Sequence, residues 1–344
     1  MKPPSFCVPV LLNLVCILNL ATAETSPYVL YVSNEISGDI TVVNGETLTV
    51  LHSFPVGKRP RGIEITPDGA HVLVALSGSP RMGPGADPER ARDLKADKSA
   101  DGIAVVDRAT GKIARTLSVG SDPEKFALSA DGHSLFVANE DTAEISAWDY
   151  ASGQKLWVAP VSEEPEGVAV HPRRPEVFAG CEQGGDIYVL DTATGQQLSR
   201  ILVGARPRSI AFSPDGNQAY VALEGEGSVA VIDVTTRQLR SKIKLDPAPT
   251  LPMGVAPLPD GRHLLVTTGR IGKLARLDLA SEKAVLAPVG KRPWGVVLSP
   301  DGKRVFTANG PSNDVSVVEV ETMKEIARVK VGQGPWGLAI GPRE

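Results

Sequence analysis

Seven prolines in this sequence are each flanked by two residues, most of which have charged or aromatic side chains that can bind ligands. The flanking pairs are Arg59/Arg61, Asp122/Glu124, Glu164/Glu166, Arg206/Arg208, Leu251/Met253, Arg292/Trp294 and Gly334/Trp336. Arginine offers a planar fork of N–H donors to carboxylates, and tryptophan offers a flat ring for stacking. If the fold brings these pairs together, they could bind a flat anionic molecule.

Two interpretations of these pairs are open. The two acidic pairs lie between two basic ones along the chain, so Arg61 and Arg208 could simply form ion pairs with neighbouring carboxylates. Arg292, Trp294 and Trp336 face no obvious acid and favour a small-molecule pocket, although the two tryptophans could instead fill the core. The candidate ligand-binding residues are therefore Arg59, Arg61, Arg206, Arg208, Arg292, Trp294 and Trp336.

Other reactive side chains give no convergent pattern. Four glutamates at one equivalent repeat position could offer oxygen ligands to Ca²⁺, but we expect them to be solvated charges at the rim: Glu35, Glu140, Glu182 and Glu224. The histidines are spread over different repeats: His52, His71, His133, His171 and His263. There is no Cys-x-x-Cys-His motif for covalent haem. We therefore predict no catalytic residue, no metal site and no covalently bound cofactor.

A repeat of about 42 residues must position these side chains. A Val-Gly step or its equivalent recurs at Val56, Val119, Val161, Val203, Leu245, Val289 and Val331, at intervals of 42 to 44 residues after a first interval of 63. Within each interval, short β-branched runs alternate with turns such as Ser299-Pro300-Asp301-Gly302, in which Pro fixes φ and Gly accepts positive φ. A constant period of four short strands is typical of a β-propeller.

The repeats predict an all-β, seven-bladed propeller in which each blade is a four-stranded antiparallel sheet. The residues after Val331 and those from Pro27 to Val56 together make one further repeat. The C-terminus ends where the Pro-Asp-Gly turn would come, and Tyr28 to Val32 begins like the second strand of a blade. We therefore expect the N- and C-terminal strands to close the ring in one blade, which removes exposed sheet edges.

The first 23 residues differ from the rest. Lys2, an apolar run from Phe6 to Leu20 and the sequence Ala21-Thr22-Ala23 are typical of a secretory signal peptide cleaved after Ala23, with an uncleaved anchor as the alternative. We expect residues 1–23 to be the signal peptide, residues 24–344 to be the propeller, and the mature protein to be periplasmic. It would retain only Cys181, which we expect to be a small buried side chain and not a nucleophile.

The long first interval indicates an insertion at residues 77–102. It holds five basic and five acidic residues, and Asp87-Pro88-Glu89 has the features of a helix start. We expect a short helix from about Pro88 to Ala96, in a loop on the same face as the Val-Gly-x-x-Pro loops.

The repeat resembles a known family. Ser-Pro-Asp-Gly, Phe-Thr-Ala-Asn and Ser-Val-Val-Glu-Val, all in the last full repeat, are similar to the motifs of the bacterial propellers named for their Tyr-Val-Thr-Asn (YVTN) repeat. Within that family the chain most resembles the PQQ-dependent catabolism-associated β-propeller proteins. The stretch from Ala147 to Trp157 is also similar to a blade-docking motif of PQQ dehydrogenases, which predicts structural packing of Trp157.

This resemblance implies a secreted, noncatalytic binding or scaffold protein associated with PQQ-dependent alcohol oxidation. Candidate partners are a periplasmic quinoprotein dehydrogenase, a cytochrome or transporter components, and PQQ itself is a candidate ligand. The alternatives are a lactonase or lyase of the propeller type and a propeller that binds single-stranded nucleic acid. A formal charge of −4 and 5% aromatic residues count against nucleic-acid binding. We expect a monomer.

Overall fold

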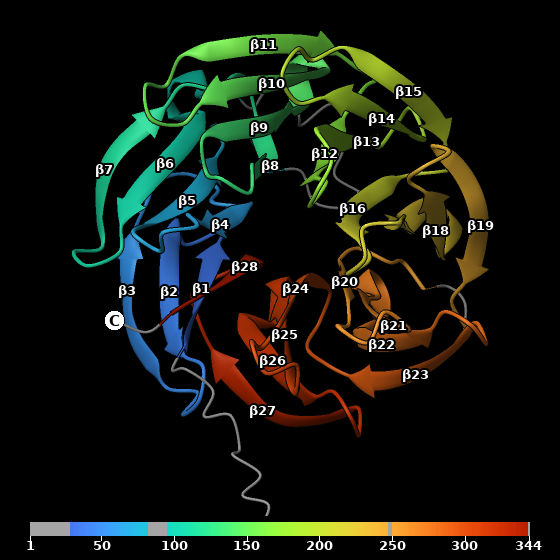
Figure 1. Ribbon diagram of the computed structural model, residues 1–344. Coiled ribbons are helices and arrows are strands. Elements are labelled where there is room, and N and C mark those ends of the chain that lie inside the picture. Colours follow the sequence, from blue (N-terminus) through green and yellow to red (C-terminus); the bar gives the residue numbers. More distant parts are fainter. Residues whose placement is uncertain (1–27, 82–94, 247–249, 343–344) are drawn as a thin grey trace, which may run out of the picture.

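The computed structural model describes residues 28–81, 95–246 and 250–342, which form a ring of seven blades around a central channel (Figure 1). Each blade is a four-stranded antiparallel sheet, as the sequence predicts. The predicted signal peptide and most of the predicted helix from Pro88 to Ala96 lie outside the described residues. No helix in the described part of the chain is long and apolar enough to cross a membrane.

Each blade contributes four strands, named from the channel outward. The closing blade has β28 (Pro335–Pro342), β1 (Tyr28–Asn34), β2 (Asp39–Asn44) and β3 (Val50–Pro55). The next three have β4 (Ile63–Ile65), β5 (His71–Leu76), β6 (Gly102–Asp107) and β7 (Lys112–Leu117); β8 (Pro123–Leu128), β9 (Ser134–Asn139), β10 (Glu144–Asp149) and β11 (Lys155–Pro160); and β12 (Pro165–Val170), β13 (Glu176–Cys181), β14 (Asp186–Asp191) and β15 (Gln197–Leu202). The last three have β16 (Pro207–Phe212), β17 (Gln218–Leu223), β18 (Ser228–Asp233) and β19 (Gln238–Lys244); β20 (Val255–Pro257), β21 (His263–Thr267), β22 (Lys273–Asp278) and β23 (Lys283–Pro288); and β24 (Pro293–Leu298), β25 (Arg304–Asn309), β26 (Asp314–Glu319) and β27 (Lys324–Lys330).

Short 3₁₀ helices follow the second strand in several blades. They are η1 (Lys98–Ala100), η2 (Glu140–Thr142), η3 (Glu224–Glu226), η4 (Gly269–Ile271) and η5 (Gly310–Ser312).

The termini close the ring in one blade, as predicted. Strand β28 pairs with β1 in an antiparallel register that places Leu30 opposite Ile340 and Val32 opposite Leu338. Figure 1 shows the red C-terminal strand beside the blue N-terminal one. Strand β28 covers the inner edge of β1, so the two ends of the chain hold the ring together.

The turns form because of their side chains. In Ser299-Pro300-Asp301-Gly302, the Ser299 hydroxyl donates to Asp301 and accepts the Arg304 N–H at 2.9 Å, while Gly302 adopts a φ of 70°. The same arrangement recurs at Ser213 and Asp215. These local contacts explain why the Pro-Asp-Gly pattern is a reliable marker of the repeat.

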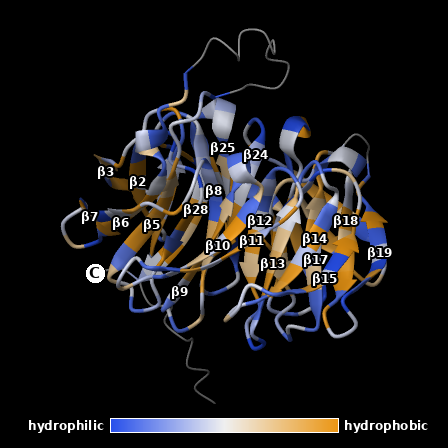
Figure 2. Cartoon of the chain, turned by 90° about the horizontal axis from the view of Figure 1, so that it is seen from above, coloured by the Kyte–Doolittle hydropathy of each residue, from blue (hydrophilic) through white to orange (hydrophobic). Residues whose placement is uncertain are grey.

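The core lies between the blades. Figure 2 shows apolar residues concentrated along the strands and hydrophilic ones in the loops at both ends of the barrel-shaped molecule. Trp157 packs as the sequence predicts: its ring lies 5.7 Å from that of Phe136, and its indole N–H donates to the Thr192 carbonyl of the next blade at 2.9 Å. Cys181 is fully buried, and burial raises its pKa to about 12, so this thiol is inert at neutral pH.

Candidate functional site

The N-terminal end of each inner strand lies at the mouth of the channel. The residue after each repeat proline points into the channel, and these residues are Arg61, Glu124, Glu166, Arg208, Met253, Trp294 and Trp336. A cavity of about 870 Å³, the mouth cavity, lies above them. All seven candidate ligand-binding residues line it, so the fold brings together Arg59, Arg61, Arg206, Arg208, Arg292, Trp294 and Trp336.

The residue before the proline has an unusual backbone. Arg59, Asp122, Glu164, Arg206 and Arg292 all have φ between 44° and 57°, the left-handed region that side chains other than glycine seldom adopt. Each such residue costs on the order of 1 kcal/mol. The repeated strain places side chains of all five around the mouth cavity.

Arg61 is the centre of one buried ion-pair network. Its guanidinium donates to Glu124 at 2.8 Å and to Asp122, and it lies 3.5 Å from Glu140. Only 3% of Arg61 is exposed. Burial acts to raise the pKa of Asp122, but the charges of Arg61 and Arg59 and hydrogen bonds from nearby serines together hold that pKa below its usual value.

Arg208 is the centre of the second network. It donates to Glu224 at 2.6 Å and to Glu166, and it lies 2.5 Å from Glu182. Arg206, which is exposed, pairs with Glu182 and Glu224 as well. The ion-pair interpretation of Arg61 and Arg208 is therefore confirmed, and both arginines are committed to protein carboxylates.

We expected four glutamates to be solvated charges at the rim. That expectation is wrong for Glu182 and Glu224, which are buried, while Glu35 and Glu140 are partly exposed but lie beside arginines. Glu182 and Glu224 are 6% and 5% exposed and bind Arg208. Glu35 pairs with Arg59 at 3.0 Å, and Glu140 lies beside Arg61. Equivalent positions in the repeat face the arginines of the same or neighbouring blades, and a sequence pattern cannot show that pairing.

Glu124, Glu140 and Glu166 form the group of carboxylates that could hold a metal ion in the described part of the chain. One oxygen from each lies within 4.8 Å of the others. Burial and the neighbouring carboxylates raise the pKa of Glu140, and burial raises that of Glu166 to about 8. Arg61 and Arg208 already bind Glu124 and Glu166. The negative charge of this cluster is therefore balanced by guanidinium groups and bound protons, and a metal ion is not needed to balance it.

Arg292 differs from the other mouth arginines. It forms no ion pair with the described carboxylates, and its guanidinium lies over the Trp294 ring at 4.9 Å from the ring centroid. Burial lowers the pKa of Arg292 and the charge of Glu224 opposes this shift, while the charges of Arg270 and Arg208 add to it. Arg270 and Arg208 line the same cavity. This side of the mouth is therefore rich in arginine, and among the described residues the Arg292 guanidinium has no ion-pair partner.

Trp294 and Trp336 stack on each other. Their ring centroids are 5.7 Å apart and their planes differ by 26°. Both rings are half-buried and line the cavity, so they are more than core filler. Since Arg292 and Trp336 both lie against Trp294, a ligand would meet Arg292 and Trp336 first.

The ends of the insertion lie at the mouth, as predicted. Ser79 and Pro80 accept hydrogen bonds from Arg59, Lys58 pairs with Asp97 at 2.6 Å, and Lys98 pairs with Asp141. Lys95 and Ala96, at the end of the predicted helix, are irregular in structure.

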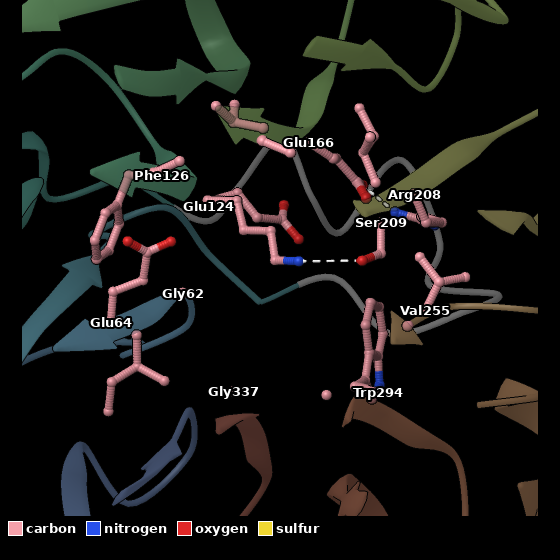
Figure 3. Close-up of a pocket in the computed structure, with 18 of the residues that line it drawn as sticks. Gly62, Glu64, Glu124, Phe126, Glu166, Arg208, Ser209, Val255, Trp294 and Gly337 are labelled. Atoms are coloured by element: carbon pink, nitrogen blue, oxygen red, sulfur yellow. Dashed lines mark hydrogen bonds and ion pairs between the residues drawn. The ribbon is translucent and has the colours of Figure 1, made fainter. Parts of the chain in front are cut away.

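A second cavity of about 420 Å³, the chamber, continues the channel inward. It shares five lining residues with the mouth cavity, which form the neck: Glu124, Glu166, Arg208, Trp294 and Trp336. Figure 3 shows Glu64, Phe126, Ser209 and Val255 around it. Burial raises the pKa of Glu64 to about 7 and lowers that of Lys125, which also lines the chamber.

The sequence interpretation missed Glu64 and Lys125. A signal was present, because both are charged at repeat positions where the other inner strands carry small or apolar residues.

Comparison with known proteins supports the fold. A family model described as a YNCE-like β-propeller matches residues 86–343. No curated protein matches the chain significantly. Among solved structures, the chain is similar to hydrazine synthase of Kuenenia stuttgartiensis, with a TM-score of 0.68 and 20% identity over 81% of this chain and 89% of that one.

Two further structures cover the whole ring. A functionally unknown protein from Desulfotomaculum acetoxidans has a TM-score of 0.73 and 15% identity over 92% of this chain and 99% of that one. A provisionally assigned 6-phosphogluconolactonase of Bacteroides uniformis has a TM-score of 0.73 and 18% identity over 92% and 100%. At these identities the similarities show the fold alone.

Proposed function

This chain belongs to the YNCE-like β-propeller family, and from that premise we propose that its channel mouth binds a small planar anion without transforming it. One observation carries the proposal. Arg292 has no carboxylate partner among the described residues, yet it lies half-buried at 4.9 Å from the Trp294 ring, in a cavity where the other central arginines are paired. An uncommitted, partly desolvated guanidinium beside aromatic rings is suited to a flat carboxylate.

The size and charge of the mouth cavity support this class of ligand. Its volume of about 870 Å³ lies within the range of small-molecule sites. Arg81, Arg270 and Arg292 line it, with Trp336 beside them. A ligand with two or more carboxylates could bind more than one of these guanidinium groups while its ring lies against Trp336.

The finer proposal follows the resemblance of the repeat. PQQ is a planar quinone with several carboxylates. It therefore matches a site that combines guanidinium groups with an aromatic ring. We propose that the mature protein is a periplasmic binding or scaffold component associated with PQQ-dependent alcohol oxidation. Its partner would be a quinoprotein dehydrogenase, a cytochrome or a transporter component.

The binding experiment uses intrinsic fluorescence. The chain has four tryptophans, and two of them line the mouth. Titration with PQQ or with simple planar dicarboxylates, corrected for absorption by the ligand, should give saturable quenching. Arg292→Ala should weaken binding roughly ten- to a hundredfold, because it removes a charge-assisted contact.

Three controls define the site. The double variant Trp294→Phe/Trp336→Phe should lose the quenching, whereas Trp148→Phe should keep it, because Trp148 is buried away from the mouth against Ser146. Arg240→Ala, on the exposed face of β19, should bind like the unchanged protein. If no ligand changes the signal up to millimolar concentration, the mouth is not a site for planar anions.

The lactonase or lyase alternative has one observation in its favour, the Glu124, Glu140 and Glu166 cluster. A catalytic cation there would have to displace Arg61 and Arg208 from two of its three ligands. Addition of divalent cations distinguishes the two functions, because only a protein with a cation site at this cluster would be stabilised by them.

A further inference from the structure

Two positions of the inner strands are nearly uniform around the ring. The second residue after each proline is glycine or serine in six strands: Gly62, Gly167, Ser209, Gly254, Gly295 and Gly337. In the seventh it is Lys125. The fourth residue after each proline is alanine or valine in six strands: Ala127, Ala169, Ala211, Ala256, Val297 and Ala339. In the seventh it is Glu64.

The glycines have a structural reason. A Cβ at Gly62 would lie 2.8 Å from the Glu124 carbonyl oxygen, and a Cβ at Gly254 would lie 2.5 Å from that of Trp294. The inner strands thus approach each other closely at this level, and a side chain is normally excluded. Lys125 is the exception to that rule. The irregularity in the pairing of β8 with β9 does not account for it, because β12, β16 and β24 carry the same irregularity after their proline.

The Lys125 amine has almost no partners. Its single hydrogen bond in the described part of the chain goes to the Ser209 hydroxyl at 3.4 Å, the contact that the dashed line to Ser209 marks in Figure 3, and it forms no ion pair there. The walls around it combine apolar side chains, such as Phe126, Ile210 and Val255, with the charged groups at the neck. An amine held this way is costly for stability, because lysines inside proteins are normally paired.

Glu64 faces the same chamber from the adjacent blade. Its carboxylate accepts the Leu128 N–H at 3.0 Å and forms no ion pair with Lys125. Burial shifts both groups toward their neutral forms, raising the pKa of Glu64 to about 7 and lowering that of Lys125. The other charged groups that face them, Glu124, Glu166 and Arg208, are held at the neck by the two arginine networks.

We propose that Lys125 is the nucleophilic amine of a second site, in the chamber, which captures small apolar aldehydes as an imine. The proposal rests on an amine without an ion pair among the described residues, in a partly apolar cavity of about 420 Å³ that shares its neck residues with the mouth cavity. It does not depend on the anion at the mouth. Desolvated lysines in apolar pockets are activated in this way because the neutral amine is the reactive form.

The reaction balances without an added cofactor. The neutral Lys125 nitrogen attacks the aldehyde carbon, and a proton moves from nitrogen to oxygen to give the carbinolamine. Protonated Glu64 then donates a proton to the hydroxyl group, which leaves as water while the carbon–nitrogen double bond forms. Loss of the remaining N–H proton to Glu64 restores its carboxyl group and leaves the neutral imine.

The experiment traps this imine. The full-length protein is incubated with low concentrations of benzaldehyde or butanal and sodium cyanoborohydride at pH 7, and peptide mapping by mass spectrometry locates the reduced adducts over time. Lys125 should be labelled at least about tenfold faster than exposed lysines such as Lys112, since an ordinary amine with a pKa near 10.4 is almost fully protonated at pH 7. The measurement is repeated at pH 6, where Lys125 should again be labelled faster than Lys112.

Variants separate the chemistry from folding. Lys125→Arg keeps the charge and length but cannot form an imine, so the fast adduct should disappear while circular dichroism is unchanged. Lys125→Met tests the same point without a charge, and Glu64→Gln should slow labelling at least about fivefold because the proton donor is lost. Exposed Lys112→Gln should leave the fast adduct intact.

Two outcomes would overturn the proposal. One is labelling of Lys125 no faster than that of exposed lysines at either pH. The other is a fast adduct that persists in both Lys125 variants. Neither result bears on the mouth cavity, because PQQ or dicarboxylate quenching of Trp294 and Trp336 does not require the amine.

Discussion

The Arg108 guanidinium donates a hydrogen bond to the carbonyl oxygen of Pro342, 234 residues further along the chain. Arg108 follows β6, and the same side chain donates to the Tyr31 hydroxyl at 2.9 Å and to the Gly69 carbonyl. One buried arginine therefore ties the final strand, the first strand and the neighbouring blade together. The closing blade is fixed by side-chain contacts as well as by the pairing of β1 with β28.

Arg108→Ala should destabilise the ring. It leaves two backbone carbonyls and the Tyr31 hydroxyl without this donor, so we expect a loss of about 2 to 4 kcal/mol in the free energy of unfolding, measured by urea denaturation. Arg240→Ala, an exposed arginine on β19, is the matched control and should change stability by less than about 0.5 kcal/mol. Equal effects of the two substitutions would show that the arginine does not hold the closing blade.

Substitution of Arg61 should destabilise the fold much more than substitution of Arg292. Arg61→Met leaves Asp122 and Glu124 buried without their counter-charge, at a cost of about 3 to 5 kcal/mol in unfolding free energy. Arg292→Ala should cost no more than about 1 kcal/mol, the value of its contact with Trp294. Urea denaturation measures both, and a large loss with Arg292→Ala would assign that residue a structural role instead of a binding one.

The chamber should make stability depend on pH. The pKa of Glu64 is about 7 in the folded protein and about 4.3 in an unfolded chain, so between these values the folded state binds a proton that the unfolded state releases. The free energy of unfolding should therefore fall as pH rises from about 4.5 to 7, by up to about 3 kcal/mol from this group. Lys125 opposes the shift of Glu64 to the extent that its amine is protonated.

Glu64→Gln isolates this contribution. Urea denaturation at a series of pH values should show a flatter profile for the variant than for the unchanged protein. Glu321→Gln, at an exposed turn position, should keep the original slope. Parallel profiles for all three proteins would contradict the raised pKa of Glu64.

Divalent cations should have little effect on the mouth. Arg61 and Arg208 bind Glu124 and Glu166, and the raised pKa values of Glu140 and Glu166 favour bound protons at neutral pH. Millimolar Ca²⁺ or Mg²⁺ should therefore leave Tm unchanged at pH 7, with EDTA-treated protein as the reference. A rise of several degrees that Glu140→Gln abolishes would instead support the cation-dependent lactonase or lyase alternative.

The fold could be predicted from the sequence because its determinants are local. The Ser-Pro-Asp-Gly turn forms from side chains within five residues of each other, and short β-branched runs mark the strands. Because the repeat has a constant length, ring closure required the two termini to share a blade. The seven mouth residues followed from the same reasoning, because each one flanks a proline at the start of an inner strand.

The partners of the charged residues were decided only by the tertiary structure. Whether Glu182 lies in solvent or against Arg208 depends on the spacing and twist of separate blades, which no local pattern encodes. The stacking of Trp294 on Trp336 and the isolation of Arg292 arise in the same way. Lys125 and Glu64 stand out in the repeat as charged exceptions, but their shifted pKa values result from burial in the chamber that all seven inner strands enclose.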